Sequence, residues 1–180
     1  MAAAQITSQL LTRTHSYCEA VEVLYKANYF SFRGMTGTSS FRTLVTPANW
    51  NMLRKLHIST TFLTPKHGLM ITQNNGLRLP GENYYEWERG CHILGYLFEL
   101  RIVRFEITFM HKHQLHDSDP LVIDQEPVIF VLGACKLIRA QEFLVELNLE
   151  LPHTTIQRLS GIPFTILRHS KQYDWRTFSS

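Results

Sequence analysis

Hydrophobic and polar residues alternate along several short segments of this chain. From Arg104 to Met110, aromatic and aliphatic residues occupy every second position, and mostly polar residues stand between them. A period of two places neighbouring side chains on opposite faces of a β-strand, so each such segment predicts a strand with one apolar face. The predicted strands are residues 28–33, 55–61, 104–110, 143–149 and 163–168.

Apolar residues three or four positions apart fill the intervals between these strands and indicate amphipathic helices. Thr46 and Asn83 are residue types that cap helix N-termini, and Pro47 is favourable in a first turn. The predicted helices are residues 7–27, a short one from Pro47, residues 83–98 and one from Pro127. The remaining segments are predicted loops at 34–40 and 111–120, an insertion at 63–81 and a tail at 170–180.

The order of these elements predicts the fold class. Helices between successive strands require parallel pairing with crossover connections. A doubly wound parallel sheet has strands that are apolar on both faces, whereas these strands are apolar on one face only. We therefore predict a single α/β domain over residues 1–180. Its irregular helix–strand repeats would form a leucine-rich-repeat-like arc, with a mostly parallel sheet and helices on one face.

Composition and charge narrow the classes of function. The chain has 18 Lys and Arg residues against 15 Asp and Glu, and the basic residues form no run, so no nucleic-acid partner is expected. No apolar run approaches the roughly 18 residues of a membrane span, so no membrane association is expected either. The three cysteines are far apart, which predicts free thiols and a cytoplasmic or nuclear location. No cofactor-binding motif occurs, so no cofactor is expected.

Four stretches of the sequence carry a family resemblance. They are LLTRTHSYCEAVEVLYKANYFSF at 10–32, WERGCHILGYLFELRIVRFEI at 87–107, QEFLVELNLELP at 141–152 and PFTILR at 163–168. Together they resemble a large fungal family of uncharacterised domains that usually follow an F-box-like segment. The shared motifs are core patterns without a catalytic signature, so the resemblance implies a fold and no particular activity. This chain begins after the F-box-like position, so no ligase-adaptor role is expected.

The stretch from Trp87 to His92 has two interpretations, a reactive thiol beside a base or the buried face of a helix. Neighbouring residues on a helix point about 100° apart, so Cys91 and His92 are poorly placed to form a catalytic pair. Trp87, Cys91, Leu94 and Phe98 follow helical steps and share one face. Unpaired cysteine is also among the most buried residue types. We therefore predict that this face belongs to the core.

Candidate functional residues lie on the polar faces of the predicted strands. Helices on one side of the sheet leave the other side open, and side chains on adjacent strands are about 4.8 Å apart there. A histidine beside a carboxylate is a simple proton-transfer pair, which makes His57, Glu106 and Glu146 the candidate catalytic residues. The alternative is a solvated face with cross-strand ion pairs. Candidate ligand-binding residues on this face are Tyr29, Arg33, Arg104, Thr108 and Asn148, and it further carries Ser31, Ser59, Thr61, Thr165 and His169.

Two functions follow from this face. The first is a binding module that holds a protein partner or a small hydrophobic molecule on the open side of the sheet. The second is a cofactor-free enzyme of fungal secondary metabolism, which would catalyse a cyclisation or an isomerisation through shape and acid–base chemistry. A deep apolar pocket with convergent polar groups would favour the enzyme, and a flat polar face would favour the module.

The segment HKHQLHD, at residues 111–117, is the best candidate for a metal site, because it supplies His111, His113, His116 and Asp117. No second cluster completes the set of ligands or supplies the groups that orient them, so a polar loop is the preferred interpretation. We predict that protein purified without a polyhistidine tag contains no stoichiometric zinc. Elemental analysis tests this, and a value near one zinc per chain would contradict it.

Overall fold

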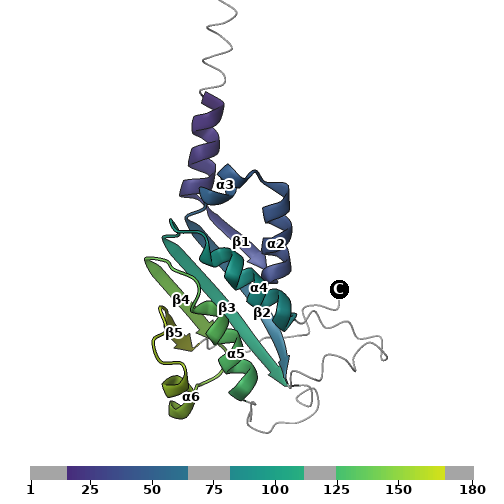
Figure 1. Ribbon diagram of the computed structural model, residues 1–180, viewed down its shortest axis with the longest axis vertical. Coiled ribbons are helices and arrows are strands. Elements are labelled where there is room, and N and C mark those ends of the chain that lie inside the picture. Colours follow the sequence, from purple (N-terminus) through teal and green to yellow (C-terminus); the bar gives the residue numbers. More distant parts are fainter. Residues whose placement is uncertain (1–15, 65–81, 112–124, 169–180) are drawn as a thin grey trace, which may run out of the picture.

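The computed structural model describes residues 16–64, 82–111 and 125–168. Its strands form one parallel sheet in which the order in space follows the order in the sequence (Figure 1). The two long strands have ten residues each, and the strands at the edges have five and four. The strands are β1 (Tyr29–Arg33), β2 (Lys55–Thr64), β3 (Ile102–His111), β4 (Glu142–Leu147) and β5 (Thr165–Arg168).

Helices connect successive strands, and α2, α4 and α5 lie across the same face of the sheet (Figure 1). The five-stranded parallel sheet with its connecting helices confirms the predicted α/β class. Thr46 caps α3 by accepting a hydrogen bond from the Asn49 backbone, and Asn83 caps α4 in the same way from Tyr85, as predicted for both caps. The helices are residues 16–27, α2 (Gly34–Leu44), α3 (Pro47–Asn51), α4 (Tyr84–Gly95), α5 (Gln125–Cys135) and α6 (His153–Arg158).

Paired residues form rows across the sheet. His57 on β2 lies opposite Ser31 on β1 and Arg104 on β3. Two residues further along, Glu106 on β3 lies opposite Glu146 on β4. The positions between these rows are apolar and point toward the helices, so the predicted alternation of faces is confirmed.

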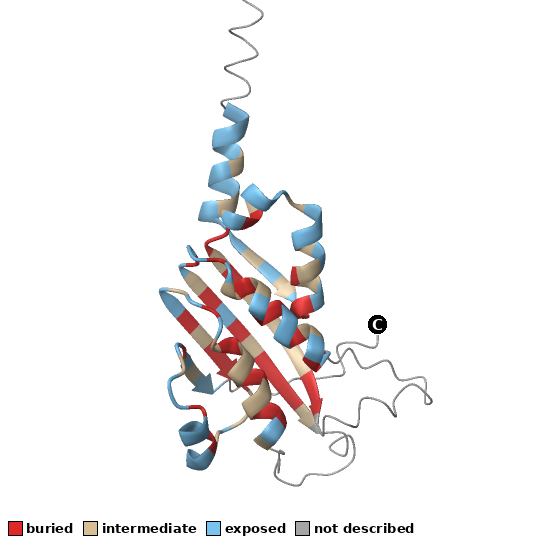
Figure 2. Ribbon diagram, viewed as in Figure 1, coloured by how far each residue is buried: buried red, intermediate tan, exposed pale blue. Residues whose placement is uncertain are grey.

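The hydrophobic core fills the space between the sheet and the helices (Figure 2). Trp87 of α4 lies within this core and is inaccessible to solvent. Its indole Nε1 donates a hydrogen bond to the Val131 carbonyl of α5 at 3.0 Å. Its ring meets Phe62 of β2 and Phe105 of β3 in edge-on contacts, with centroid distances of 5.3 and 5.2 Å. Trp87 therefore joins two helices to the two long strands.

The helix α2 was not expected, because residues 34–40 are rich in Gly, Ser and Thr and predict a loop. The helix begins at Gly34, whose φ of 70° is a conformation that glycine adopts readily. The Glu82 carboxylate accepts hydrogen bonds from the Met35 backbone N–H and from the Thr60 hydroxyl, each at 2.8 Å. A side chain at position 34 would collide with this carboxylate. A distant acidic residue thus stabilises the start of the helix, where backbone N–H groups lack partners.

Other predicted boundaries also differ from the structure. The helix predicted over 83–98 ends at Gly95, and Phe98 is 81% exposed, so it does not belong to the core face. Gly95 approaches the Leu137 backbone so closely that a Cβ atom there would meet the carbonyl oxygen at 2.8 Å. The strand β2 continues to Thr64 and takes the first residues of the predicted insertion, and α6 was not predicted. The rest of that insertion and the predicted tail lie outside the described residues.

The first helix is described from residue 16 to residue 27 and confirms that part of the predicted helix. Most of its side chains are exposed, including the large hydrophobic side chains of Tyr17 and Leu24. Tyr25 is the contact with the core, because its ring stacks on Phe30 of β1 with the centroids 5.3 Å apart. The described part of this helix therefore packs against the sheet mainly through its last turn.

We predict that Trp87→Ala lowers the free energy of unfolding by about 3–5 kcal/mol, because it leaves a large cavity and removes a buried hydrogen bond. Chemical denaturation followed by circular dichroism measures this difference. Tyr85→Ala is the matched control, since Tyr85 lies on the same helix and is 69% exposed. It should change stability by no more than about 0.5 kcal/mol. Equal stability of the two variants would contradict the assignment of Trp87 to the core.

Candidate functional site

A hollow of about 560 Å³ lies on the sheet face opposite the helices. We call it the open-face hollow. It is built at the starts of β1 to β4, and four of the predicted site residues line it: Tyr29, His57, Arg104 and Glu106. Its complete lining is Tyr29, Ser31, His57, Ile102, Val103, Arg104, Glu106, Glu142 and Leu144.

His57 contacts polar groups on both neighbouring strands. The distance between Ser31 Oγ and His57 Nδ1 is 3.1 Å, which is a hydrogen bond whose direction depends on the histidine tautomer. On the other side, His57 Nε2 lies 3.7 Å from Glu106 Oε2. The two side chains are about a quarter exposed, at 30% and 23%. The imidazole is therefore held between a hydroxyl and a carboxylate while it remains accessible from solvent.

Arg104 and Glu146 form an ion pair beside the imidazole. The Glu146 side chain is 8% exposed, whereas the Arg104 side chain is 53% exposed. A nearly buried carboxylate requires a partner of opposite charge, and the guanidinium supplies it while it covers the carboxylate from solvent. Arg104 is consequently anchored at one end and presents the rest of its surface to the hollow.

Both charge contacts follow one geometric rule. His57 is the register partner of Arg104 but contacts Glu106, which is two residues further along β3. Arg104 is likewise the register partner of Leu144 but pairs with Glu146. Long side chains reach such diagonal neighbours on the same face of a sheet. The register of the strands thus determines which acid meets which base.

The other predicted site residues lie outside the open-face hollow. Thr108 is buried, and Arg33 is exposed at the end of β1. Both hydrogen-bonding groups of the Asn148 amide bind one backbone: Oδ1 accepts from the Phe109 N–H at 2.8 Å, and Nδ2 donates to the Phe109 carbonyl at 2.9 Å. Asn148 therefore prolongs the pairing of β3 with β4 by its side chain. His169 lies outside the described residues.

Sequence reasoning missed four residues of the lining, one of which is the buried Val103. Ile102 and Leu144 provide apolar surface next to Arg104, and Glu142 adds a carboxylate at the edge of the hollow. A signal for Ile102 and Leu144 was present in the sequence, because each stands two residues before a position already assigned to the open face. Ile102 and Leu144 were overlooked because apolar residues were expected on the helix side alone.

Among the described residues, no group of three or more His, Cys, Asp and Glu side chains is arranged to hold a metal ion. The side chains of the candidate metal segment, His111, His113, His116 and Asp117, lie outside the described part of the chain. In the same described residues, no helix combines the length and the apolar character that crossing a membrane requires.

Cys91 and His92 do not form a catalytic pair. Cys91 is inaccessible to solvent, whereas His92 is exposed and packs against Tyr96 with the ring centroids 5.1 Å apart. Burial, reinforced by a hydrogen bond with Cys135, raises the pKa of the Cys91 thiol well above its usual range. A protonated, buried thiol is a poor nucleophile, and this agrees with its assignment to the core.

Residues 1–157 match the family described as a domain of unknown function, DUF7730. The chain belongs to this family. The match confirms the expected membership of an uncharacterised domain family. The residues of the DUF7730 match include the whole lining of the open-face hollow. Searches of curated proteins and of solved structures found no match to the chain.

We predict that Cys91 makes the DUF7730 domain less stable at high pH. The pKa of its thiol is raised in the folded state. The contribution of Cys91 to the free energy of unfolding is therefore complete below the pKa of the same thiol in the unfolded chain, about 8.5, and is lost as the pH rises above that value. Between pH 7.5 and 9.5 the wild type should lose about 1.4 kcal/mol more than Cys91→Ala. Urea unfolding at both pH values measures the difference, and parallel losses in the two proteins would refute it.

Proposed function

We propose that this DUF7730 domain is a binding module whose ligand occupies the open-face hollow. The observation that carries the proposal is the convergence of His57, Arg104 and Glu106 from neighbouring strands on one hollow. Binding sites combine apolar lining with a few polar groups that fix orientation, and Ile102 and Leu144 supply apolar lining beside these three residues. The ligand is a small, largely hydrophobic molecule or a side chain of a protein partner.

The edge of the hollow supports a ligand with an apolar body. Tyr29 provides an aromatic wall at the edge strand β1, and Lys55 Nζ lies 5.4 Å from the centre of its ring. A cation over an aromatic face restrains the ring, so the wall is partly preorganised. A planar or aliphatic group would lie against Tyr29 and Leu144, and a polar group on the ligand would meet His57 or Arg104.

The setting of this proposal rests on the resemblance found in the sequence. We propose that the chain is a fungal domain of the kind that usually follows an F-box-like segment. Its helix–strand repeats would form a leucine-rich-repeat-like arc. Proteins with such arcs bind partners on the face that helices leave uncovered. The open-face hollow has that position relative to α2, α4 and α5.

A second candidate is a cofactor-free enzyme of fungal secondary metabolism that catalyses a cyclisation or an isomerisation. It is favoured by the line of contacts from Ser31 through His57 to Glu106, because an imidazole between a hydroxyl and a carboxylate can accept and return a proton. In that case His57 is the acid–base group, Glu106 stabilises its protonated form, and Glu146 keeps Arg104 in place beside the substrate.

The test begins with a fragment and natural-product library screened by nuclear magnetic resonance. Binders whose signals perturb the residues of the open-face hollow are titrated against wild type and variants. We predict that His57→Ala and Glu106→Gln each weaken binding at least about tenfold, because each removes a polar contact at the site. Both variants should keep the wild-type circular dichroism spectrum, since neither side chain belongs to the core.

Matched controls are His92→Ala and Glu88→Gln, which make the same changes on the exposed side of α4 and should leave the affinity unchanged. Turnover of a bound compound by wild type, lost in His57→Ala while binding is retained, would establish the enzyme instead of the module. Binders that respond equally to the variants and to their controls would refute a site in the open-face hollow.

A further inference from the structure

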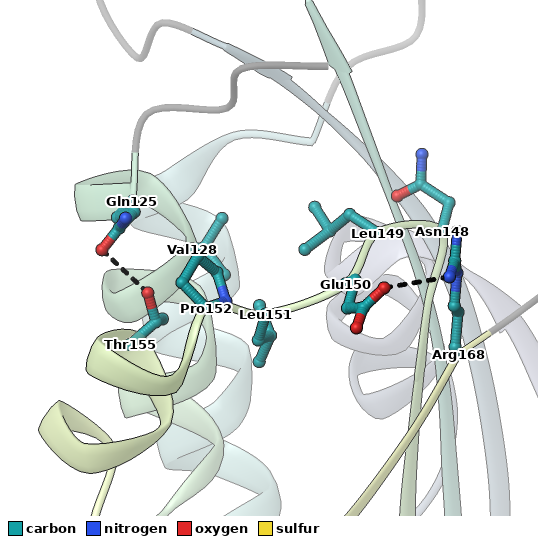
Figure 3. A pocket seen from close by; sticks show the side chains of 9 residues that line it. All are labelled: Gln125, Val128, Asn148, Leu149, Glu150, Leu151, Pro152, Thr155 and Arg168. Carbon is teal, nitrogen blue, oxygen red and sulfur yellow. Dashed lines mark hydrogen bonds and ion pairs between the residues drawn. The ribbon is translucent and has the colours of Figure 1, made fainter. Parts of the chain in front are cut away.

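A second cavity, of about 370 Å³, lies where β4 and β5 end. Figure 3 shows it between the start of α5, the start of α6 and the segment that follows β4. It shares no lining residue with the open-face hollow. We call it the β4–α6 crevice, and the residues that define it for the argument below are Val128, Leu149, Leu151, Glu150 and Arg168.

Hydrogen bonds fix each of the two walls of the β4–α6 crevice. The Asn148 amide binds the Phe109 backbone and fixes the point at which the chain leaves the sheet. On the opposite wall, the Thr155 hydroxyl donates to Gln125 Oε1 at 2.8 Å and joins α6 to the start of α5 (Figure 3). The crevice is therefore formed in advance, as ligand sites usually are.

One part of the β4–α6 crevice is apolar. Val128 of α5 is 2% exposed, and Leu149 and Leu151 are partly exposed where they pack against the core. The volume lies within the range of roughly 300–1,000 Å³ that is typical of small-molecule sites. An apolar group of a ligand would cover the exposed parts of these side chains and remove them from water.

The polar groups of the lining differ in how firmly they are bound. Gln125 and Thr155 bind each other, and the Asn148 amide is bound to backbone. Arg168 contacts Glu150 through one hydrogen bond of 3.1 Å, and the side chains are 68% and 79% exposed. An exposed ion pair of this kind contributes little to stability, and a guanidinium can bind a second carboxylate with two parallel bonds.

We propose that the β4–α6 crevice binds a small apolar molecule that carries one carboxylate. The apolar body lies against Val128, Leu149 and Leu151, and the carboxylate replaces Glu150 as the partner of Arg168. Arg168 is the single cationic side chain in the described lining, which is why the head group is an anion. This site is independent of the proposed function, because none of its residues lines the open-face hollow.

Octanoate and its neutral isostere octanamide are the probes, titrated into the full chain by isothermal calorimetry. We expect saturable binding of one octanoate and at least about tenfold weaker binding of octanamide, because the amide cannot form a charge-assisted pair with Arg168. Arg168→Gln should weaken octanoate about tenfold and leave octanamide unchanged. Glu150→Gln should strengthen octanoate about threefold, because it removes the competing carboxylate.

Two control variants separate this site from others. Arg89→Gln removes an exposed arginine from an ion pair on α4, with Glu86, and should not affect octanoate. His57→Ala should not affect it either, and its effect on the ligands of the open-face hollow is a separate measurement. Equal affinities for octanoate and octanamide, an unchanged affinity in Arg168→Gln, or a loss in His57→Ala would each overturn the proposal.

Discussion

The pairing of β2 with β3 is the constraint on which the arrangement of both faces depends. The two strands are in register over ten residues, from Lys55 with Ile102 to Thr64 with His111. Because side chains alternate along a strand, a slip of one residue would bring Arg104 to the core and Phe105 to solvent. Burial of Phe105 against Trp87 prevents this slip. The core thus sets the register, and the register sets the contacts of the open face.

The faces of the strands could be predicted because the alternation is long and regular. Phe105 and Ile107 on β3 and Val145 on β4 are buried, as their period of two predicts. The same period placed His57 and Glu106 on the opposite side, where the structure has them in contact. It did not reveal that Glu146 is nearly buried, because that burial arises from the covering Arg104 side chain on the neighbouring strand.

The features that the sequence did not reveal depend on contacts between distant residues. The N-terminus of α2 is stabilised by Glu82, which lies 47 positions beyond Met35. The role of Asn148 depends on the backbone of Phe109, 39 positions earlier. Local propensity does not detect such partners. By propensity alone, Gly34 predicts a turn, and Asn148 is expected to be a polar residue at the surface. Both become interpretable once the fold brings the partners together.

The gradation of strand length across the sheet bears on how copies of this protein meet one another. A strand at the border of a sheet offers unpaired backbone groups to other chains, and length and flatness increase that hazard. Here the borders are the five residues of β1 and the four of β5, and each ends in an arginine. On the part of β2 that lies beyond the end of β1, the Thr61 carbonyl accepts a hydrogen bond from the Glu82 N–H at 2.7 Å. The longest and most apolar strands are thereby kept from templating aggregation.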